Sequence, residues 1–338
     1  MSVRLILCGS FTLDNVIAPS GERLPQNFGG NVAYAAAGAA LWSDGIGIVA
    51  PIGANYPACF LDELANRGID LGGVRRSSAL HGMNVAFWYR SDGTRERRFP
   101  PEVYAGIPAA ERPRFTDYTV LGPDHRYRTW FAFSPQPEDI PEAWAQSAAG
   151  CHAAALPVQR HLELMRSLRA RRSDIALHVD SPWYDERAMH DDHAAPLFAL
   201  IDTLLPSEAD LAVAAPDCDP LVAARGLIAR GAKRVVVKRG ALGSMIVTAD
   251  NAVVHVPVVP VRAVDPTGAG DAYCGGFLAG LIATGDPVRA AAFGTVAASF
   301  AVETIGPLAL FDSPRREAQR RLDALWAHIE SSHLARER

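Results

Sequence analysis

Hydrophobic and polar positions follow two periods along most of the chain. Short apolar runs at residues 3–8, 175–179 and 234–238 end at a glycine or a charged residue, as buried strands do. Stretches with apolar residues at helical spacing, such as 158–171 and 219–230, lie between or beside these runs. Strands that alternate with helices predict an α/β fold, a three-layer doubly wound and mostly parallel sheet with helices on both faces.

The remaining pattern adds elements of both kinds. Further strands are predicted at 153–156, 200–205 and 245–248, and further helices at 286–302 and 314–329. Residues 100–150 are rich in proline and irregular, with strand-like stretches at 118–121 and 129–133. Ligands bind beyond the carboxyl ends of the strands in doubly wound sheets, so we expect one crevice there.

Residues 82–99 change to a strict period of two and predict a β-hairpin. Every second side chain is apolar or aromatic: Met83, Val85, Phe87 and Tyr89. The turn is supplied by Asp92 and Gly93. The return strand carries three arginines, Arg95, Arg97 and Arg98. We favour a solvated strand face for them over an anion clamp, because runs of charge are usually solvated.

Composition and charge exclude several classes of function. The chain has 338 residues, of which 49% are hydrophobic and 21% charged, enough for a large core. A net charge of −4 gives no broad electrostatic reason to bind nucleic acid or a membrane. The five cysteines are scattered without a CxxC pair, which favours reduced thiols and a cytoplasmic protein. We expect no signal peptide and no membrane span.

The segment 263–277 carries the most specific chemistry. A β-branched run interrupted by prolines leads into a turn at 265–268, and a helix follows. The first N–H groups of a helix lack internal partners, so Gly268, Ala269 and Gly270 could hold a phosphoryl group as its charge develops. Asp271 could take a proton from an attacking hydroxyl. The alternative is an ordinary acidic residue in the first turn of a helix.

The longer run Asp-x-Thr-Gly-Ala-Gly-Asp-Ala, with Gly-Gly-Phe behind it, resembles the second signature of the ribokinase-like (PfkB) carbohydrate kinase family. The resemblance implies ATP-dependent phosphorylation of a sugar or sugar-like alcohol, with ATP and Mg²⁺ bound. It implies that Asp271 is the general base and that the amides of Gly268, Ala269 and Gly270 form the anion hole. It places Thr267 on the nucleotide side.

Gly29, Gly30 and Asn31 stand before an alanine-rich helical stretch and resemble the first signature of the same family. The resemblance implies that this turn approaches the substrate and that Asp14 holds its hydroxyls. Asp14 could instead be a solvated acid at a strand edge. Tyr34 stands where the family usually carries Asn, so the identity of the substrate does not transfer from ribokinase.

The resemblance implies one kinase domain over residues 1–330, followed by a tail at 331–338. Segments at about 11–28 and 82–100 would form a small β-sheet lid over the sugar site. A lid excludes water, which competes for the phosphoryl group. An unpaired lid edge with an aromatic face would also favour a homodimer through the lid.

The nucleotide side is less regular. Ser207 and Asp210 lie where the family has Asn-x-x-Glu, so Asp210 could hold magnesium through water, or the two could simply cap a helix. Gly240 and Gly243 resemble the family's nucleotide-side strand end. Two further positions are Lys238, which could meet phosphates or be solvated, and Thr295, where the family often has Asn near adenine.

Rival functions remain at this point. The chain could be a nucleoside kinase of the same fold, or a catalytically weak homologue that binds a sugar or nucleotide for regulation. Residues 45–50 match the dinucleotide pattern GxGxxA but are themselves strand-like, so we reject an oxidoreductase. No GxxxxGK[ST] occurs, which argues against a P-loop kinase.

Overall fold

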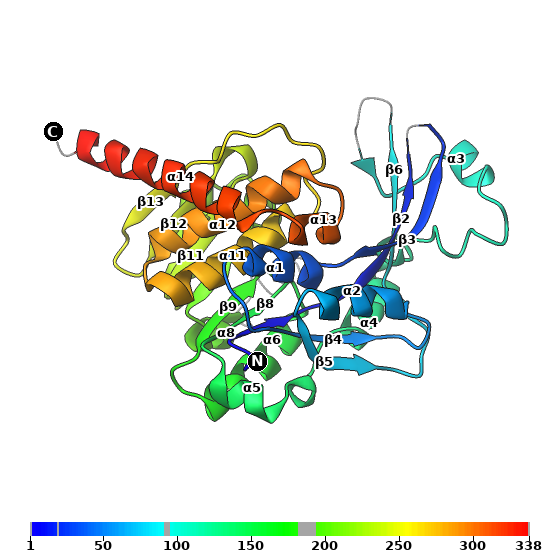
Figure 1. The fold of residues 1–338 in the computed structure, drawn as a ribbon, viewed down its shortest axis with the longest axis horizontal. Helices are drawn as coiled ribbons and strands as arrows, with labels where there is room; N and C mark the ends of the chain where they lie inside the picture. Colours follow the sequence, from blue (N-terminus) through cyan, green and yellow to red (C-terminus); the bar gives the residue numbers. More distant parts are fainter. Residues whose placement is uncertain (1, 19, 91–94, 182–193, 337–338) are drawn as a thin grey trace.

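The chain folds around two sheets in the computed structural model, which describes residues 2–18, 20–90, 95–181 and 194–336 (Figure 1). Within these residues the large sheet has nine strands in the order β13-β12-β11-β10-β9-β8-β1-β4-β5. Its strands are β1 (Leu5–Cys8), β4 (Ile46–Ile52), β5 (Asp70–Arg76), β8 (Gly150–Ala153), β9 (Ala176–Asp180), β10 (Thr203–Leu205), β11 (Arg234–Lys238), β12 (Ser244–Thr248) and β13 (Val253–Val256).

Seven of these strands, from β5 to β11, pair in parallel, and β12 and β13 pair antiparallel at one edge. The difference follows from the connections. Parallel neighbours need a long crossover, whereas residues 239–243 and 249–252 are short enough only for antiparallel returns. The expected doubly wound, mostly parallel sheet is therefore confirmed.

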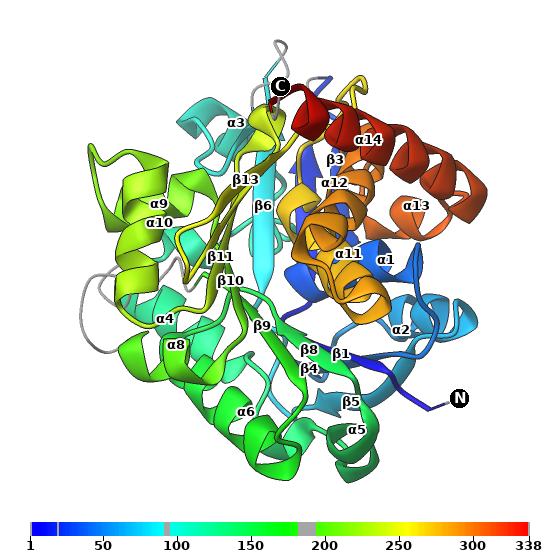
Figure 2. The same cartoon turned by 90° about the vertical axis from the view of Figure 1, so that its left-hand side faces the viewer.

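Helices cover both faces of the large sheet, as the two sides of Figure 2 show. One face carries α1 (Asn31–Ala40), α2 (Ala58–Asn66), α11 (Ala269–Thr284), α12 (Pro287–Glu303), α13 (Pro307–Phe311) and α14 (Arg315–Arg336). The other carries α5 (Glu142–Ser147), α6 (Val158–Arg171), α8 (Ala195–Leu200), α9 (Glu208–Ala214) and α10 (Pro220–Ala229). Among the described residues no helix is both long and apolar enough to cross a membrane.

Helices α1 and α11 pack with their backbones in near contact because both are built from small residues. A Cβ added to Gly275 would lie 1.8 Å from the carbonyl oxygen of Ala35, and one added to Gly38 would lie 2.2 Å from that of Ala272. The glycine-rich and alanine-rich compositions of the two helices therefore set their separation. This packing fixes the first turns of α11 against α1.

The second, small sheet has the order β3-β2-β6-β7 and projects from the body of the molecule (Figure 1). Its strands are β2 (Thr12–Ile17), β3 (Arg23–Gly29), β6 (Asn84–Tyr89) and β7 (Arg95–Glu96). β6 and β7 form the predicted antiparallel hairpin outside the large sheet. The turn expected at Asp92 and Gly93 lies outside the described residues. The return strand ends at Glu96, earlier than predicted.

Two strands predicted in the proline-rich region are wrong. Residues 118–121 contain the 3₁₀ helix η1 (Tyr118–Val120), which the Asp117 carboxylate caps by accepting from the Thr119 N–H at 2.8 Å. Residues 129–133 belong mainly to α4 (Pro123–Ala132), which has proline in its first turn. Trp130 and Phe133 are three positions apart and both pack against β6, so helical spacing overrides their strand propensity.

Smaller differences concern boundaries. The strand expected at 153–156 is β8, which ends at Ala153, and the apolar run continues buried beyond it. The run at 200–205 begins with the last residue of α8 and becomes strand at Thr203. Residues 45–50, which match the rejected dinucleotide pattern, fall almost entirely in the strand β4. Four short elements connect the rest: α3 (Pro101–Ala105), η2 (Pro137–Asp139), η4 (Gly240–Leu242) and the η1 turn.

Candidate active site

A cavity of about 790 Å³ lies at the carboxyl ends of the parallel strands, between the large sheet, the small sheet and helices α11 and α12. Strand ends contribute Ser10, Ala155, Asp180, Ser207 and Lys238 to its wall. Every residue predicted for the site lines this cavity except Gly29. The topology thus brings together groups from six distant parts of the chain, as expected for a doubly wound sheet.

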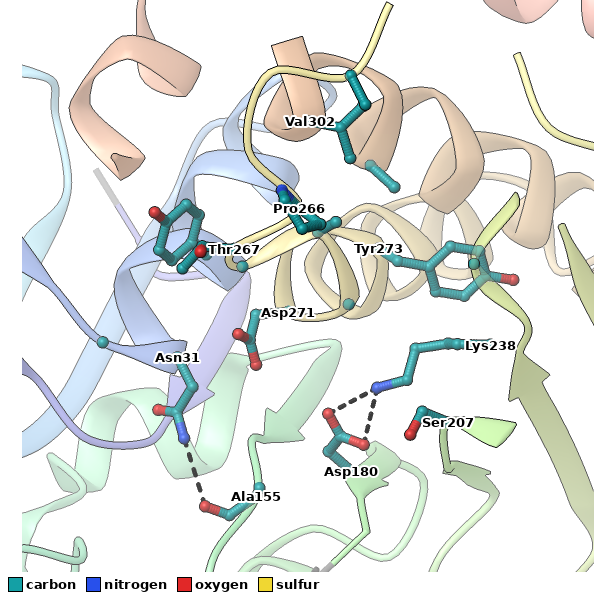
Figure 3. Close-up of a pocket in the computed structure, with 18 of the residues that line it drawn as sticks. Asn31, Ala155, Asp180, Ser207, Lys238, Pro266, Thr267, Asp271, Tyr273 and Val302 are labelled. Carbon is teal, nitrogen blue, oxygen red and sulfur yellow. Dashed lines mark hydrogen bonds and ion pairs between the residues drawn. The ribbon is translucent and has the colours of Figure 1, made fainter. Parts of the chain in front are cut away.

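The turn into α11 forms one wall (Figure 3). The Asp265 carboxylate accepts from the Thr267 N–H at 2.9 Å and from the Thr267 hydroxyl at 2.7 Å, which fixes the turn. Gly268 has φ 73°, and a Cβ there would lie 2.2 Å from the Tyr34 ring. Only glycine satisfies both constraints. The ring of the buried Tyr34 therefore packs directly against the turn.

Not all amides of the turn are equally available to an anion. The Ala269 N–H donates to the Pro266 carbonyl at a long 3.3 Å, and the Ala272 N–H closes the first helical bond to Gly268. Gly270 lies between them, with a cavity-facing surface free of a side chain. The helix start thus presents backbone and positive dipole to the cavity, as anion sites do.

Asp271 lies in the first turn of α11 with its carboxylate directed into the cavity (Figure 3). Burial raises its pKa to about 7, and the neighbouring carboxylates of Asp180 and Asp210 add to the rise, while the Lys238 ammonium opposes it. A carboxyl group with this pKa exchanges protons at neutral pH. This is the property that a general base needs.

Asp180 and Lys238 form an ion pair in the cavity wall. The Lys238 ammonium donates to both carboxylate oxygens of Asp180, at 2.8 and 2.7 Å. The side chains are 11% and 9% exposed, so the solvated alternative for Lys238 is wrong. The sequence marked Asp180 only as a residue after a strand. Its partner is 58 positions away, and no local pattern connects the two.

Ser207 and Asp210 form a reciprocal cap at the start of α9. The Asp210 N–H donates to the Ser207 hydroxyl at 3.1 Å, and one Asp210 oxygen, Oδ2, accepts from the Ser207 N–H at 2.7 Å. The same oxygen accepts from the Ser207 hydroxyl at 2.6 Å. The helix-cap interpretation is therefore correct, and both residues also line the cavity.

The opposite end of the cavity contains the residues expected to meet the acceptor. Gly30 has φ 114°, and a Cβ there would lie 2.3 Å from the Ser10 carbonyl oxygen. Gly29 lies behind Asp14, whose carboxylate would be 2.3 Å from an added Cβ. Asn31 accepts from the Ser10 N–H at 2.8 Å and donates to the Ala155 carbonyl at 3.3 Å. Asn31 thus connects two strand ends as well as lining the cavity.

The end of the cavity that lies away from Asp14 has an apolar wall near η4 and α12. Gly240 and Gly243 have φ 54° and 83°, so the backbone turns sharply after β11. Thr295 is buried in α12 and lines this part. The other apolar residues here are Val258, Val259, Pro260, Val261, Ala298 and Val302. An apolar wall beside a helix N-terminus suits a nucleotide base with its phosphates.

Sequence reasoning missed part of the acceptor end. Tyr118 and Trp130 line it together with the predicted apolar face of β6, but the sequence placed them in strands. Arg97 lines it too, and its side chain is 36% exposed, so this arginine is partly solvated and also reaches the cavity. Its guanidinium donates to the Thr119 hydroxyl at 3.3 Å and lies 5.2 Å from the centre of the Phe87 ring.

Comparison with known proteins decides the family. Residues 127–313 match the family model described as pfkB family carbohydrate kinase. The chain belongs to this family. It is a kinase that transfers a phosphoryl group from ATP to a hydroxyl of a sugar-like alcohol or nucleoside.

Individual relatives include sugar kinases and nucleoside kinases. A cytidine kinase of Thermococcus kodakarensis is 27% identical over 281 residues, covering 82% of this chain and 87% of the relative. Among solved structures, an E. coli protein assigned as a ribokinase II, in complex with ATP and Mg²⁺, is similar at TM-score 0.68 and 19% identity, covering 96% of this chain and 100% of that one. A Burkholderia thailandensis nucleoside kinase in complex with inosine is similar at TM-score 0.69 and 16% identity, covering 96% and 97%.

Proposed function

We propose that this kinase phosphorylates a nucleoside, with ATP as the donor and Asp271 as the general base. The observation that carries the proposal is an apolar, aromatic chamber beside Asp14. Strand β6 runs parallel to β2 with Val85 opposite Asp14 and Phe87 opposite Val16. Met83, Val85 and Phe87 therefore face the cavity next to the carboxylate.

A free sugar has no apolar group to fill this chamber, whereas a nucleoside carries a flat base that can. Tyr118 and Trp130 close it from the other side. Asp14 can accept from two hydroxyls of a ribose ring, which leaves the attached base among flat, apolar side chains. The name of the cytidine kinase and the inosine bound to the nucleoside kinase agree with this assignment.

The other residues take roles along the cavity. The acceptor hydroxyl would lie beside Asp271, and the γ-phosphate would lie at the Gly268 to Gly270 turn. The apolar wall near Thr295 and Gly243 would hold adenine. The small sheet would act as a lid that excludes water over the acceptor, within a single kinase domain.

Magnesium fits this site through its waters rather than through a protein cage. In the described part of the chain no group of three or more acidic, histidine or cysteine side chains could hold a metal. Mg²⁺ usually keeps several waters and binds phosphates with one or two carboxylates. Asp210 lines the cavity and is the residue that would hold such a water. When bound, the ion neutralises phosphate charge.

Two further proposals follow from the surface and the cysteines. The small sheet leaves β3 and β7 as its edge strands, which favours dimerisation through this sheet. Light scattering at micromolar concentration tests this, and a monomer would contradict it. All five cysteines are free, in keeping with a cytoplasmic location.

The test is a kinetic panel with the purified full-length chain, ATP and magnesium. We expect the best of cytidine, uridine, adenosine, guanosine and inosine to exceed free ribose and deoxyribose in kcat/KM by 10²-fold or more, about the value of burying a base in an apolar pocket. Product analysis should show a nucleoside monophosphate. A free sugar that equals or exceeds every nucleoside would overturn the proposal.

A pair of substitutions tests which end of the cavity holds the nucleobase of the acceptor. Val85→Phe narrows the chamber and should raise KM for the nucleoside while leaving ribose phosphorylation intact. Val302→Phe narrows the opposite end and should instead raise KM for ATP with either acceptor. Equal effects of the two variants on both substrates would contradict the assigned ends of the cavity.

A further inference from the structure

The buried pair of Asp180 and Lys238 has no evident structural purpose. The two residues end β9 and β11, on either side of β10, so the ion pair spans a strand. Both side chains are largely withdrawn from water. A buried ion pair contributes little to stability because desolvation offsets the attraction between the charges. A pair kept inside a catalytic cavity therefore calls for a chemical explanation.

The ammonium of Lys238 lies directly against the first turns of α11. Its Nζ is 3.5 Å from Sγ of Cys274, the residue three positions after Asp271. A Cβ added to Gly270 would lie 3.6 Å from the same nitrogen. Lys238 thus places a positive charge beneath the turn that would receive the phosphoryl group, on the side shown in Figure 3.

The charges that surround this point are mostly negative. Four aspartates line the cavity, and three of them, Asp180, Asp210 and Asp271, lie close to one another around this point. Among the described lining residues the cationic side chains are Lys238 and Arg97, and Arg97 lies at the acceptor end against Phe87. A phosphoryl group arriving between these carboxylates meets strong repulsion unless a cation contacts it. Among the described residues, Lys238 is the side chain placed to do so.

We propose, building on the kinase function above, that Lys238 is a further catalytic residue whose ammonium donates to an oxygen of the transferred phosphoryl group, and that Asp180 is the positioning residue that holds the ammonium there. In the transfer step the acceptor oxygen bonds to the γ-phosphorus as the bond to the β–γ bridging oxygen breaks. The electron pair leaves with ADP, the hydroxyl proton passes to Asp271, and Lys238 keeps its protons.

Asp180 is needed because a lysine stem is flexible and its ammonium is strongly hydrated. Two hydrogen bonds to one carboxylate hold Nζ in place before ATP binds. Burial alone would lower the pKa of Lys238, but the Asp180 charge outweighs it and the net direction is upward. Lys238 therefore remains protonated at neutral pH, and its charge is oriented in advance.

The experiment compares Lys238→Met and Asp180→Asn with the wild type, using whichever acceptor the wild type phosphorylates. Lys233→Met is the matched control, because Lys233 precedes the same strand and pairs with Asp202 at 2.9 Å on the exposed surface. We expect Lys238→Met to lower kcat by about 10²–10³-fold, the usual effect of removing one preorganised donor. Asp180→Asn should lower kcat less, and Lys233→Met should leave it unchanged.

A binding measurement separates this inference from the choice of acceptor. With ADP and magnesium bound, aluminium fluoride is an analogue of the phosphoryl group in the transition state. No acceptor is required for this measurement. The mixture should raise the Tm of the wild type and of Lys233→Met further than ADP and magnesium alone. Lys238→Met should lose this extra increase but keep the shift due to ADP. If no nucleoside is phosphorylated yet this pattern holds, the acceptor class is wrong and the role of Lys238 stands.

A pH profile adds a readout that a purely structural pair would not change. The groups that face Asp271 are Asp180 from β9, Lys238 from β11, Asp210 from α9, Cys274 from α11 and Tyr34 from α1. Loss of the Lys238 charge should move the acidic limb of kcat/KM to higher pH. A folded Lys238→Met enzyme with wild-type kcat, an unmoved pH limb and a full aluminium fluoride shift would overturn the proposal.

Discussion

At the scale of single residues, we expect the raised pKa of Asp271 to favour activity and to lower stability. Its folded pKa of about 7 lies well above the usual carboxyl value, chiefly because the group is buried. A carboxyl group that ionises near physiological pH gives a carboxylate whose basicity is well matched to proton abstraction. The same shift means that the native state holds a charged carboxylate at a cost above pH 7.

The activity side gives a prediction for the wild type and for Asp271→Asn. The base must be ionised, so kcat/KM of the wild type should rise with pH and level off above about 7. Asp271→Asn keeps the shape but removes the proton acceptor, so kcat should fall by about 10²–10⁴-fold with ATP affinity nearly unchanged. Steady-state kinetics from pH 5 to 9 measure both. Near-normal kcat in the folded variant would refute the assigned base.

The stability side has the reverse sign. Because the folded pKa of Asp271 is raised, the native state binds a proton that the unfolded chain has already released, and stability falls as pH rises from about 4 to about 7. Asp271→Asn removes this cost. Its Tm should exceed that of the wild type at pH 8 and approach it near pH 4. Differential scanning calorimetry measures both Tm values. A Tm difference between variant and wild type that stays constant from pH 4 to pH 8 would show that the Asp271 charge does not destabilise the fold.

At the scale of elements, the start of α9 combines two functions in four residues. Asp210 accepts two hydrogen bonds from Ser207 and lines the cavity. Asp210→Ala should therefore lower stability by about 1 kcal/mol through the cap and also raise the magnesium concentration for half-maximal activity. Ser207→Ala loses cap bonds but no charge. An equal magnesium dependence for the two variants would restrict Asp210 to capping.

The contact between α1 and α11 makes a second test at this scale. Glycine to alanine in a helix normally stabilises by about 1 kcal/mol. Gly226→Ala in α10 should do so, because nothing lies within 4 Å of the added Cβ. Gly275→Ala should destabilise instead, since its Cβ would overlap the Ala35 carbonyl and push the helices apart. Urea unfolding of both variants measures the difference, and two changes of the same sign would contradict the packing argument.

The same elements show which features a sequence reveals. The turn into α11 and the hairpin of β6 were predictable because local chemistry, glycine in a turn or alternation along a strand, determines them. Trp130 was placed in a strand because its side chain suits either structure until packing against β6 decides. Lys238 was predicted as a nucleotide-side residue, but its pairing with Asp180 was not, because the two residues meet only when β9, β10 and β11 assemble. Local rules thus fix the elements, and topology fixes the pairing of charges.

At the scale of the whole molecule, the large sheet carries reactive groups at one end and unusual polar groups in its core. His152 and His178 are paired neighbours on β8 and β9 and are fully buried. Neither of the two rings has a hydrogen-bond partner among the described residues. His161 bonds through one ring nitrogen to the Ala154 carbonyl. The core therefore holds these imidazoles in the neutral form.

Burial lowers the pKa of His178 to about 3 and those of His161 and His81 to about 4, and the pKa of His152 shifts in the same direction. The unfolded chain protonates these groups near pH 6.5. Their contribution is therefore complete above about 6.5 and is lost as pH falls toward the folded values, by up to about 1.4 kcal/mol per pH unit for each group. Acid should unfold this protein cooperatively well above the pKa of its surface carboxylates.

The corresponding variant is His178→Leu, which replaces an imidazole without partners by an apolar side chain next to Phe277. At pH 8 its stability should lie close to that of the wild type, since no hydrogen bond is lost. Between pH 6.5 and 4 its free energy of unfolding should fall less steeply, because one fewer proton is taken up on unfolding. The exposed His255→Gln serves as the control and should leave the slope unchanged. Urea titrations at five pH values give the slopes directly, and a His178→Leu slope equal to that of the wild type would show that this buried imidazole is not what makes the fold sensitive to acid.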